Sequence, residues 1–194
     1  MPTKNRKQRV REVLSHRQPD LRIVLEDITN THNASAVART CDAAGILYLD
    51  IIYTSPEPFP INESISTKAE KWLHFNHFSS TEECFLSLKK KKYKIASTHL
   101  GPDALPYTSI DYTQPIALVF GNEKKGVSDQ ALELSDYLIK IPMFGMVQSL
   151  NLSVSAGIIL YHACQERIKK GWYDKSRLNE KAFKKFWNEW LGIK

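Results

Sequence analysis

Three groups of polar side chains stand where apolar runs of this sequence end, and they are the residues that could do chemistry. The first group holds Asn33 and Arg39, the second is the run GNEKKG at residues 121–126, and the third holds Ser149 and Asn151. Amides, hydroxyls and a guanidinium can bind and orient a polar ligand. Ligands of open α/β sheets lie at the carboxyl ends of strands, so the position of these groups predicts a binding site there.

Each group also has a plainer structural interpretation. Asn33 and Ser149 suit the N-cap positions of helices, and we expect each to cap the helix beside it. Arg39 lies in a helix of small residues, where it is either a surface side chain or a charge that needs a partner. The run at 121–126 is neither a P-loop nor a Gly-x-Gly-x-x-Gly fingerprint. No Ser-His-Asp arrangement can be read, so hydrolysis is not supported.

The composition is that of a globular chain. Its 194 residues are 42% hydrophobic and 25% charged, which predicts one domain with additions. No apolar run is long enough for a bilayer, and the N-terminus lacks the apolar segment of a signal peptide, so we expect a cytoplasmic protein. Cys41, Cys84 and Cys164 lie far apart with no metal-ligand spacing. We expect buried free thiols, with no disulfide and no metal site.

The net charge of +6 is spread unevenly. Residues 1–20 hold six basic and two acidic residues, and residues 167–194 hold nine and three. The part between them holds twelve basic and sixteen acidic residues. Two basic ends on a mildly acidic body favour a polyanionic partner, with nucleic acid first. A pair of solvated amphipathic helices explains the same pattern equally well.

Apolar runs typical of strands alternate with helical stretches along the chain. This alternation predicts an α/β fold, with a mostly parallel six-stranded sheet and helices on both faces. Residues 55–60, SPEPFP, are predicted to form a loop. The six predicted strands are residues 21–25, 46–53, 71–78, 93–98, 115–120 and 137–143.

Two of the predicted helices flank the polar groups. Residues 34–44 are almost all small, and Gly45 follows them at the position where helices end in a left-handed residue. From Leu150 onward, apolar and small residues recur at helical spacing through Val154, Ile158 and Tyr161. This spacing predicts a buried helix.

Helical extensions are predicted at both ends of the chain. Residues 3–16 form a basic helix with one apolar edge, and residues 179–191 form the last helix. We expect the aromatic residues of the last helix to pack on the body or on the N-terminal helix rather than on bases, because helical aromatic stripes are usually core. These aromatic residues share one face and are Phe183, Phe186, Trp187 and Trp190.

Together, the three polar groups resemble the three motifs of the SpoU/TrmH family of the SPOUT superfamily. The matching segments are Asn30-x-x-Asn33 with Arg39-Thr40, then GNE-x-x-G at 121–126, then IPM-x-G through SLN at 141–151. They stand in the family's order and cover most of residues 28–155. Members of the family are RNA ribose 2′-O-methyltransferases that use S-adenosyl-L-methionine. The resemblance also implies a deep trefoil knot in the C-terminal half and a homodimer whose active site uses both subunits.

The resemblance carries residue roles with it. It implies that Arg39, Asn33, Ser149 and Asn151 are catalytic. We expect Arg39 to clamp a phosphate and stabilise oxyanion charge rather than act as a base, because a guanidinium barely deprotonates. Glu123 is expected to fix its loop or the partner subunit. The residues implied for cofactor binding are Thr98, Leu100, Gly121, Asn122, Glu123, Ile141, Met143, Leu150 and Leu152.

The basic ends favour one branch of this family. A short basic N-terminal helix and a basic aromatic tail resemble the members that methylate guanosine 18 in the D-loop of tRNA. The resemblance therefore implies a tRNA partner, with phosphate contacts from Arg9, Arg11, Lys181 and Lys184. It divides the chain into an N-terminal extension (1–20), a methyltransferase domain (21–170) and a C-terminal extension (171–194). The alternatives are ribosomal RNA or another tRNA position as substrate, and an RNA-binding protein without catalysis.

Overall fold

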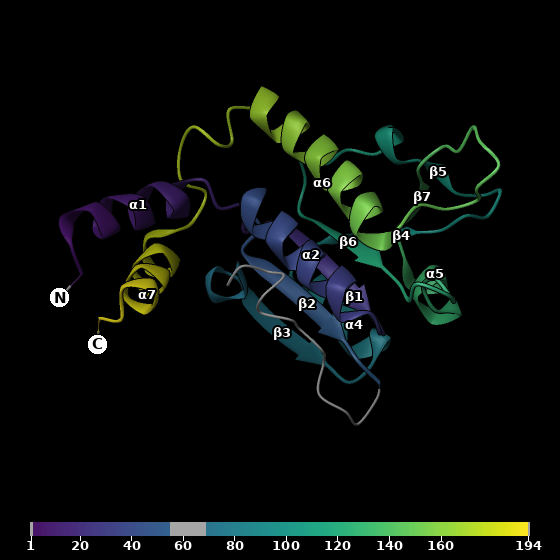
Figure 1. Cartoon of the computed structure of the whole chain (residues 1–194), viewed down its shortest axis with the longest axis horizontal. Helices are drawn as coiled ribbons and strands as arrows, with labels where there is room; N and C mark the ends of the chain where they lie inside the picture. Colours follow the sequence, from purple (N-terminus) through teal and green to yellow (C-terminus); the bar gives the residue numbers. More distant parts are fainter. Residues whose placement is uncertain (1, 55–68, 194) are drawn as a thin grey trace.

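The computed structural model describes residues 2–54 and 69–193, and Figure 1 shows their arrangement. The loop predicted at 55–60 lies outside the described residues. Within them, seven strands form one parallel sheet in the order β3-β2-β1-β6-β4-β7-β5. The strands are β1 (Leu21–Glu26), β2 (Tyr48–Ile52), β3 (His74–Phe78), β4 (Lys94–Thr98), β5 (Leu105–Pro106), β6 (Ile116–Phe120) and β7 (Tyr137–Lys140).

The parallel α/β prediction is confirmed, but the predicted count of six strands is wrong. The added strand, β5, is only two residues long and pairs with Ile139 and Lys140 of β7. A dipeptide within a loop has no periodicity of its own, so only its pairing makes it a strand. The last predicted strand is also shorter than expected, because β7 ends at Lys140 and residues 141–143 leave the sheet. The trefoil knot stays a prediction.

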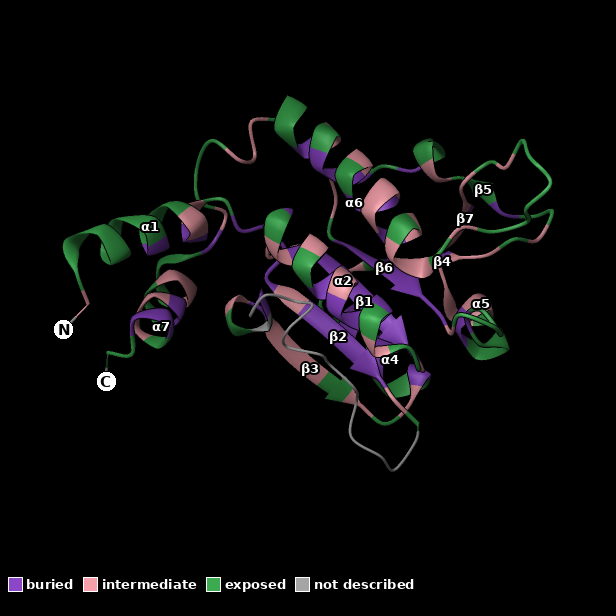
Figure 2. Cartoon of the chain, in the orientation of Figure 1, coloured by how far each residue is buried: buried purple, intermediate pink, exposed green. Residues whose placement is uncertain are grey.

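Helices cover both faces of the sheet, as predicted. α2 (Thr31–Ala43) and α6 (Leu152–Lys169) lie side by side on one face, and α4 (Thr81–Lys90) and α5 (Asp129–Leu134) pack on the other. Each face of the sheet has its own hydrophobic core. Because side chains alternate along a strand, the neighbours Ile23 and Val24 pack into different cores, one on each face. β1 and β6 are buried along their whole length (Figure 2).

Both predicted helix caps are wrong by two or three residues. The N-cap of α2 is Asn30, whose Oδ1 accepts from the amides of His32 (2.9 Å) and Asn33 (3.4 Å). The N-cap of α6 is Asn151, whose Oδ1 accepts from the amide of Ser153 (2.9 Å). Asparagine caps as well as serine does, so residue type alone could not choose between neighbours. The side chain of Asn33 is consequently free for contacts outside its own helix.

α6 buries a different stripe from the predicted one. Val154 and Tyr161 are each 48% exposed, whereas Ile159, Leu160 and Ala163 face the sheet. The helix has two apolar stripes. Helical spacing predicts an apolar stripe from either of them, and the one chosen from the sequence is the one that faces away from the sheet. The outward stripe has no cover from the described part of the chain.

The terminal helices pack against each other beside the body. α1 (Lys4–Ser15) and α7 (Glu180–Leu191) lie together at the opposite end of the molecule from α5 (Figure 1). Leu14 of α1 shares a buried cluster with Phe186 and Trp190 of α7 and with Leu47 of the body. The prediction that the tail aromatics are core is confirmed. Short 3₁₀ turns, η1 (Ala69–Trp72) and η2 (Tyr107–Ser109), complete the elements.

Two further predictions can be compared with the structure. Cys41, Cys84 and Cys164 are buried free thiols, as expected. Gly45 follows α2 with φ +77°, and a Cβ there would lie 2.8 Å from the carbonyl oxygen of His16, so this helix end needs glycine. In the described ranges, no helix is both long and apolar enough to cross a membrane.

Candidate functional site

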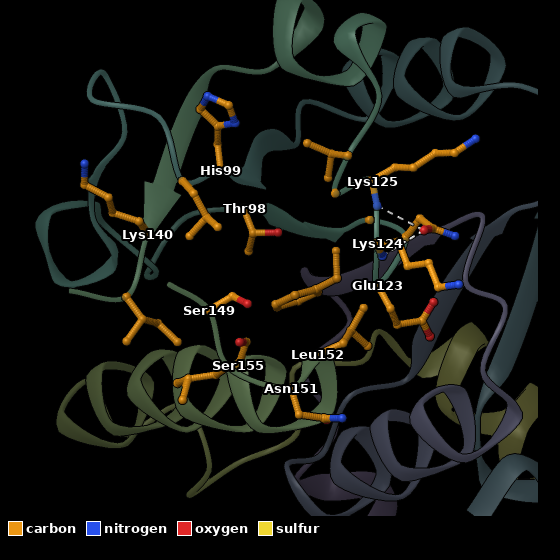
Figure 3. A pocket seen from close by; sticks show the side chains of 18 of the residues that line it. Thr98, His99, Glu123, Lys124, Lys125, Lys140, Ser149, Asn151, Leu152 and Ser155 are labelled. Atoms are coloured by element: carbon orange, nitrogen blue, oxygen red, sulfur yellow. Dashed lines mark hydrogen bonds between the residues drawn. The ribbon is translucent and has the colours of Figure 1, made fainter. Parts of the chain in front are cut away.

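A cavity of about 870 Å³ opens at the carboxyl ends of the central strands. Its size is that of sites for cofactor-sized ligands. Figure 3 shows Glu123 and Asn151 on one side of it and His99 and Lys140 on the other. Its walls come from the segments after β1, β4, β6 and β7 and from the first turns of α6. A parallel sheet brings these strand ends to one edge.

The cavity brings together all but one of the residues predicted for catalysis and cofactor binding. All nine residues implied for cofactor binding line it. Of the four implied catalytic residues, Asn33, Ser149 and Asn151 line it and Arg39 does not. Their chemical roles stay predictions.

A connected chain of hydrogen bonds joins the three polar groups. Glu123 Oε1 accepts from the amide of Asn30 (3.2 Å) and from Asn33 Nδ2 (3.1 Å). Its Oε2 accepts from the amide (3.3 Å) and hydroxyl (3.2 Å) of Thr29. Asn33 Oδ1 in turn accepts from Asn151 Nδ2 (3.0 Å). Residues 90 or more positions apart are therefore held in one line of side chains.

These hydrogen bonds lower the pKa of Glu123. Partial burial acts to raise the pKa of its carboxyl, but the hydrogen bonds from Asn33 and from the backbone amides of Thr29 and Asn30 outweigh burial. The pKa of Glu123 consequently lies below its ordinary value. An ionised carboxylate whose two oxygens already accept four hydrogen bonds is an anchor rather than a proton acceptor.

The loop that carries Glu123 depends on glycine. A Cβ on Gly121 would lie 2.2 Å from the backbone of Gly126, and Gly126 has φ +74°. Asn122 closes the turn, because its Oδ1 accepts from the amides of Lys124 (2.9 Å) and Lys125 (3.1 Å). Its Nδ2 donates to the carbonyl of Asp27 (2.8 Å). Both glycines are therefore needed for the tight turn of the loop that forms one wall of the cavity.

Several cavity residues were missed by the sequence reasoning. Lys124 and Lys125 belong to the GNEKKG run but were not predicted to have a role there. His99 and Lys140 had no signal beyond following or ending a strand, and Lys140 Nζ donates to the carbonyl of Gly101 (2.9 Å). Among the described residues, no group of His, Cys, Asp and Glu could hold a metal ion.

Arg39 stands apart from the cavity. It is exposed on α2, and its side chain makes no hydrogen bond or ion pair within residues 2–54 and 69–193. It follows Asn33 by six residues, which places it roughly 9 Å further along the helix axis and about 240° around it. Asn33 and Arg39 therefore leave the helix in different directions, and only Asn33 lines the cavity.

Comparisons with known proteins agree with this geometry. The profile of the SpoU rRNA Methylase family matches residues 20–161. The tRNA (guanosine(18)-2′-O)-methyltransferase of Thermus thermophilus is 43% identical over 189 residues, which are 97% of each chain. The crystal structure of the Aquifex aeolicus TrmH/SpoU tRNA modifying enzyme is similar with a TM-score of 0.93 and 40% identity, over 97% of this chain and 96% of that one.

A more distant structure was solved with a ligand. The SpoU methyltransferase AviRb from Streptomyces viridochromogenes, in complex with the cofactor AdoMet, has a TM-score of 0.69 and 25% identity. The match covers 80% of this chain and 62% of that one.

The lowered pKa of Glu123 predicts a pH-dependent contribution to stability. A depressed folded-state pKa stabilises the fold above the unfolded value, near 4.5, and this stabilisation is lost as pH falls through the folded-state pKa. Glu123→Gln should therefore be less stable than the parent in urea at pH 7, and the difference should shrink below about pH 4.5. Glu133→Gln, an exposed change on α5, is the control. A gap that stays constant down to pH 3 would contradict the prediction.

Proposed function

The chain belongs to the SpoU rRNA methylase family, and from this premise we propose that it methylates the ribose 2′-hydroxyl of guanosine 18 in the D-loop of tRNA. The methyl donor in this proposal is S-adenosyl-L-methionine. The observation that carries the proposal is the hydrogen-bond chain Glu123–Asn33–Asn151, which joins the three family motifs at one cavity. The near full-length similarity to the Thermus enzyme supports the tRNA position.

The residues at the cavity fit the proposed cofactor. The volume suits a ligand of this size, and the tight turn that begins at Gly121 forms part of the cavity wall. The segments at Thr98–Leu100, 141–143 and 150–152 would hold the adenosine and methionine parts through backbone and apolar contacts. When bound, S-adenosylmethionine supplies an electrophilic methyl group on its sulfonium.

The side chains of the chain itself would orient the ribose. We assign Asn33, Ser149 and Asn151 to hold the sugar, with Glu123 as the anchor that fixes Asn33. Positioning a hydroxyl in line with its electrophile can supply much of the rate. Because Glu123 is stabilised as the carboxylate by its donors, we assign it no proton transfer.

Arg39 would act from outside the cavity of its own chain. Its exposed guanidinium is free to hold an RNA phosphate beside the reacting ribose, and in a dimer it can face the other subunit's site. A planar fork binds phosphate bidentately, and it stabilises oxyanion charge that develops nearby.

We also propose that the chain forms a homodimer. The outward stripe of α6 leaves Val154, Tyr161 and Ile168 about half exposed. Gly157 within this stripe has open space above it, because a Cβ there would meet nothing within 4 Å. An apolar helix face with a glycine at its centre suits close approach of a second helix. Sedimentation equilibrium measures the proposed state directly, and a monomer at all concentrations would contradict it.

The paired terminal helices would form the tRNA-binding surface. This surface carries four exposed basic side chains: α1 contributes Arg9 and Arg11, and α7 contributes Lys181 and Lys184. Phosphate contacts position an RNA without reading its sequence. In this proposal residues 1–20 and 171–194 are the two extensions and residues 21–170 are the methyltransferase domain, in a protein of the cytoplasm.

The proposal is tested by transfer of tritiated methyl groups to total tRNA and to ribosomal RNA, followed by mapping of the modified nucleotide. We expect label in tRNA at guanosine 18. Label only in ribosomal RNA, or at another tRNA position, would replace the substrate. No transfer together with intact RNA binding would leave an RNA-binding protein without catalysis.

Asn151 should matter for turnover beyond its role as a cap. Asn151→Asp keeps an oxygen to accept from the amide of Ser153, but it places a carboxylate oxygen where Nδ2 now donates to Asn33. We expect normal thermal stability and a turnover lower by roughly ten- to a hundredfold, the scale of misplacing a positioned group. Asn151→Ala, which also removes the cap, should additionally cost about 1 kcal/mol of stability. Wild-type turnover in Asn151→Asp would reduce this residue to a cap.

Arg39→Lys tests the clamp. Lysine keeps the charge but cannot make the bidentate fork, so we expect turnover to fall on the order of a hundredfold while cofactor affinity is unchanged. Lys90→Arg, an exposed exchange of the same two head groups on α4 away from the cavity, is the control and should retain turnover. Near wild-type turnover of Arg39→Lys with unchanged RNA affinity would exclude the clamp.

A quadruple variant tests the basic surface of the terminal helices. It replaces four side chains by neutral glutamine and should weaken tRNA binding; the four are Arg9, Arg11, Lys181 and Lys184. Each lost phosphate contact should flatten the log–log salt dependence by roughly one unit, without affecting cofactor affinity, because the cavity lies elsewhere. The control removes four charges from the lysine run 89–92 at the end of α4. An unaltered salt slope in the quadruple variant would mean that the ends only complete the fold or dimer.

A further inference from the structure

Glu26 is a buried carboxylate that the proposed chemistry does not use. It is the last residue of β1 and is only 3% exposed, between the starts of α4 and α5. Within the described ranges it forms no ion pair. Burying a polar group is costly unless hydrogen bonds replace the lost water, so the donors to Glu26 indicate what its carboxyl group holds in place.

Its donors come from two different helices. Oε1 accepts from the hydroxyls of Thr81 (2.5 Å) and Ser128 (2.7 Å), and Oε2 accepts from the amide of Ser128 (2.8 Å). Thr81 is the first residue of α4, which does not line the cavity. Ser128 is the N-cap of α5, and its Oγ accepts from the amide of Ala131 (3.1 Å).

Ser128 also ends the loop that forms one wall of the cavity. This 121–128 loop is attached to the segment after β1 near its start, where Asn122 donates to the carbonyl of Asp27 and Glu123 accepts from Thr29 and Asn30. Glu26 holds the other end of the loop. The part between the two attachments contains Gly126 and Val127, which line the cavity.

We propose that Glu26 is a positioning residue of the cofactor site, which fixes the 121–128 loop in its ligand-binding shape through Ser128. This role rests on the proposed function, in which the cavity binds S-adenosylmethionine. Glu26 lies outside the cavity lining, so it acts through the loop and not by contact with the ligand.

The two hydroxyl donors on Oε1 provide a matched pair for the test. Glu26→Met removes every acceptor at similar volume, whereas Thr81→Val removes only the hydrogen bond on the α4 side. Both should lower the melting temperature, the second by roughly 3 °C. Only Glu26→Met should speed amide exchange of residues 122–128 and raise the Kd for S-adenosylmethionine, by calorimetry, on the order of tenfold.

A second variant keeps the test informative if Glu26→Met folds poorly. Ser128→Ala leaves the carboxylate in place and removes one loop donor, and it should speed the same amide exchange and raise the same Kd severalfold. Wild-type exchange and Kd in Glu26→Met or Ser128→Ala would overturn the role. So would an equal rise in Kd in Thr81→Val, since general loosening would then be the cause. If the parent chain binds no S-adenosylmethionine, the proposed function fails, and exchange of residues 122–128 in the same variants still decides whether Glu26 holds the loop.

Discussion

The hydrogen bonds that converge on Glu123 are the interaction on which this site depends. A parallel sheet brings strand ends to one edge, but it does not orient the side chains that follow them. Glu123 does so by accepting hydrogen bonds from the backbone amides of Thr29 and Asn30, at the start of α2, and from the side-chain amide of Asn33. Helix starts leave amides without partners, so the carboxylate meets donors that would otherwise need water. Asn33 in turn accepts a hydrogen bond from Asn151, which fixes the start of α6 relative to α2.

The 121–128 loop contains two glycines, and hydrogen bonds to other segments hold it in place. Gly121 packs directly on the backbone of Gly126, and Gly126 has a left-handed backbone, so the turn is tighter than residues with side chains would allow. A loop of this composition would otherwise be a weak element, since glycine loses much conformational freedom on folding. Asn122 and Glu123 attach it to the segment after β1, and Ser128 attaches it to Glu26 at the end of β1. The restraint comes from hydrogen bonds, which leave the wall itself open for contact.

α6 has two apolar stripes, and only one of them is covered by the described part of its own chain. One stripe, around Ile159 and Ala163, packs on the sheet, and the other, around Val154 and Tyr161, faces outward. A helix with two apolar stripes needs cover on both of them. The proposed dimer would enclose this one, and it would also place the exposed Arg39 of α2 near a second subunit.

The sequence by itself determined the class of fold, six of the seven strands and the three polar segments of the site. Strand and helix periodicity is local, and the spacing of Asn33, Gly121 and Asn151 matches a family pattern. Tertiary structure decided what depends on partners distant in the chain. It made β5 a strand through pairing, chose Asn30 and Asn151 as caps, and turned the predicted face of α6 outward. It also placed Arg39 outside the cavity, because the direction of a side chain on a helix has meaning only once the neighbours of that helix are in place.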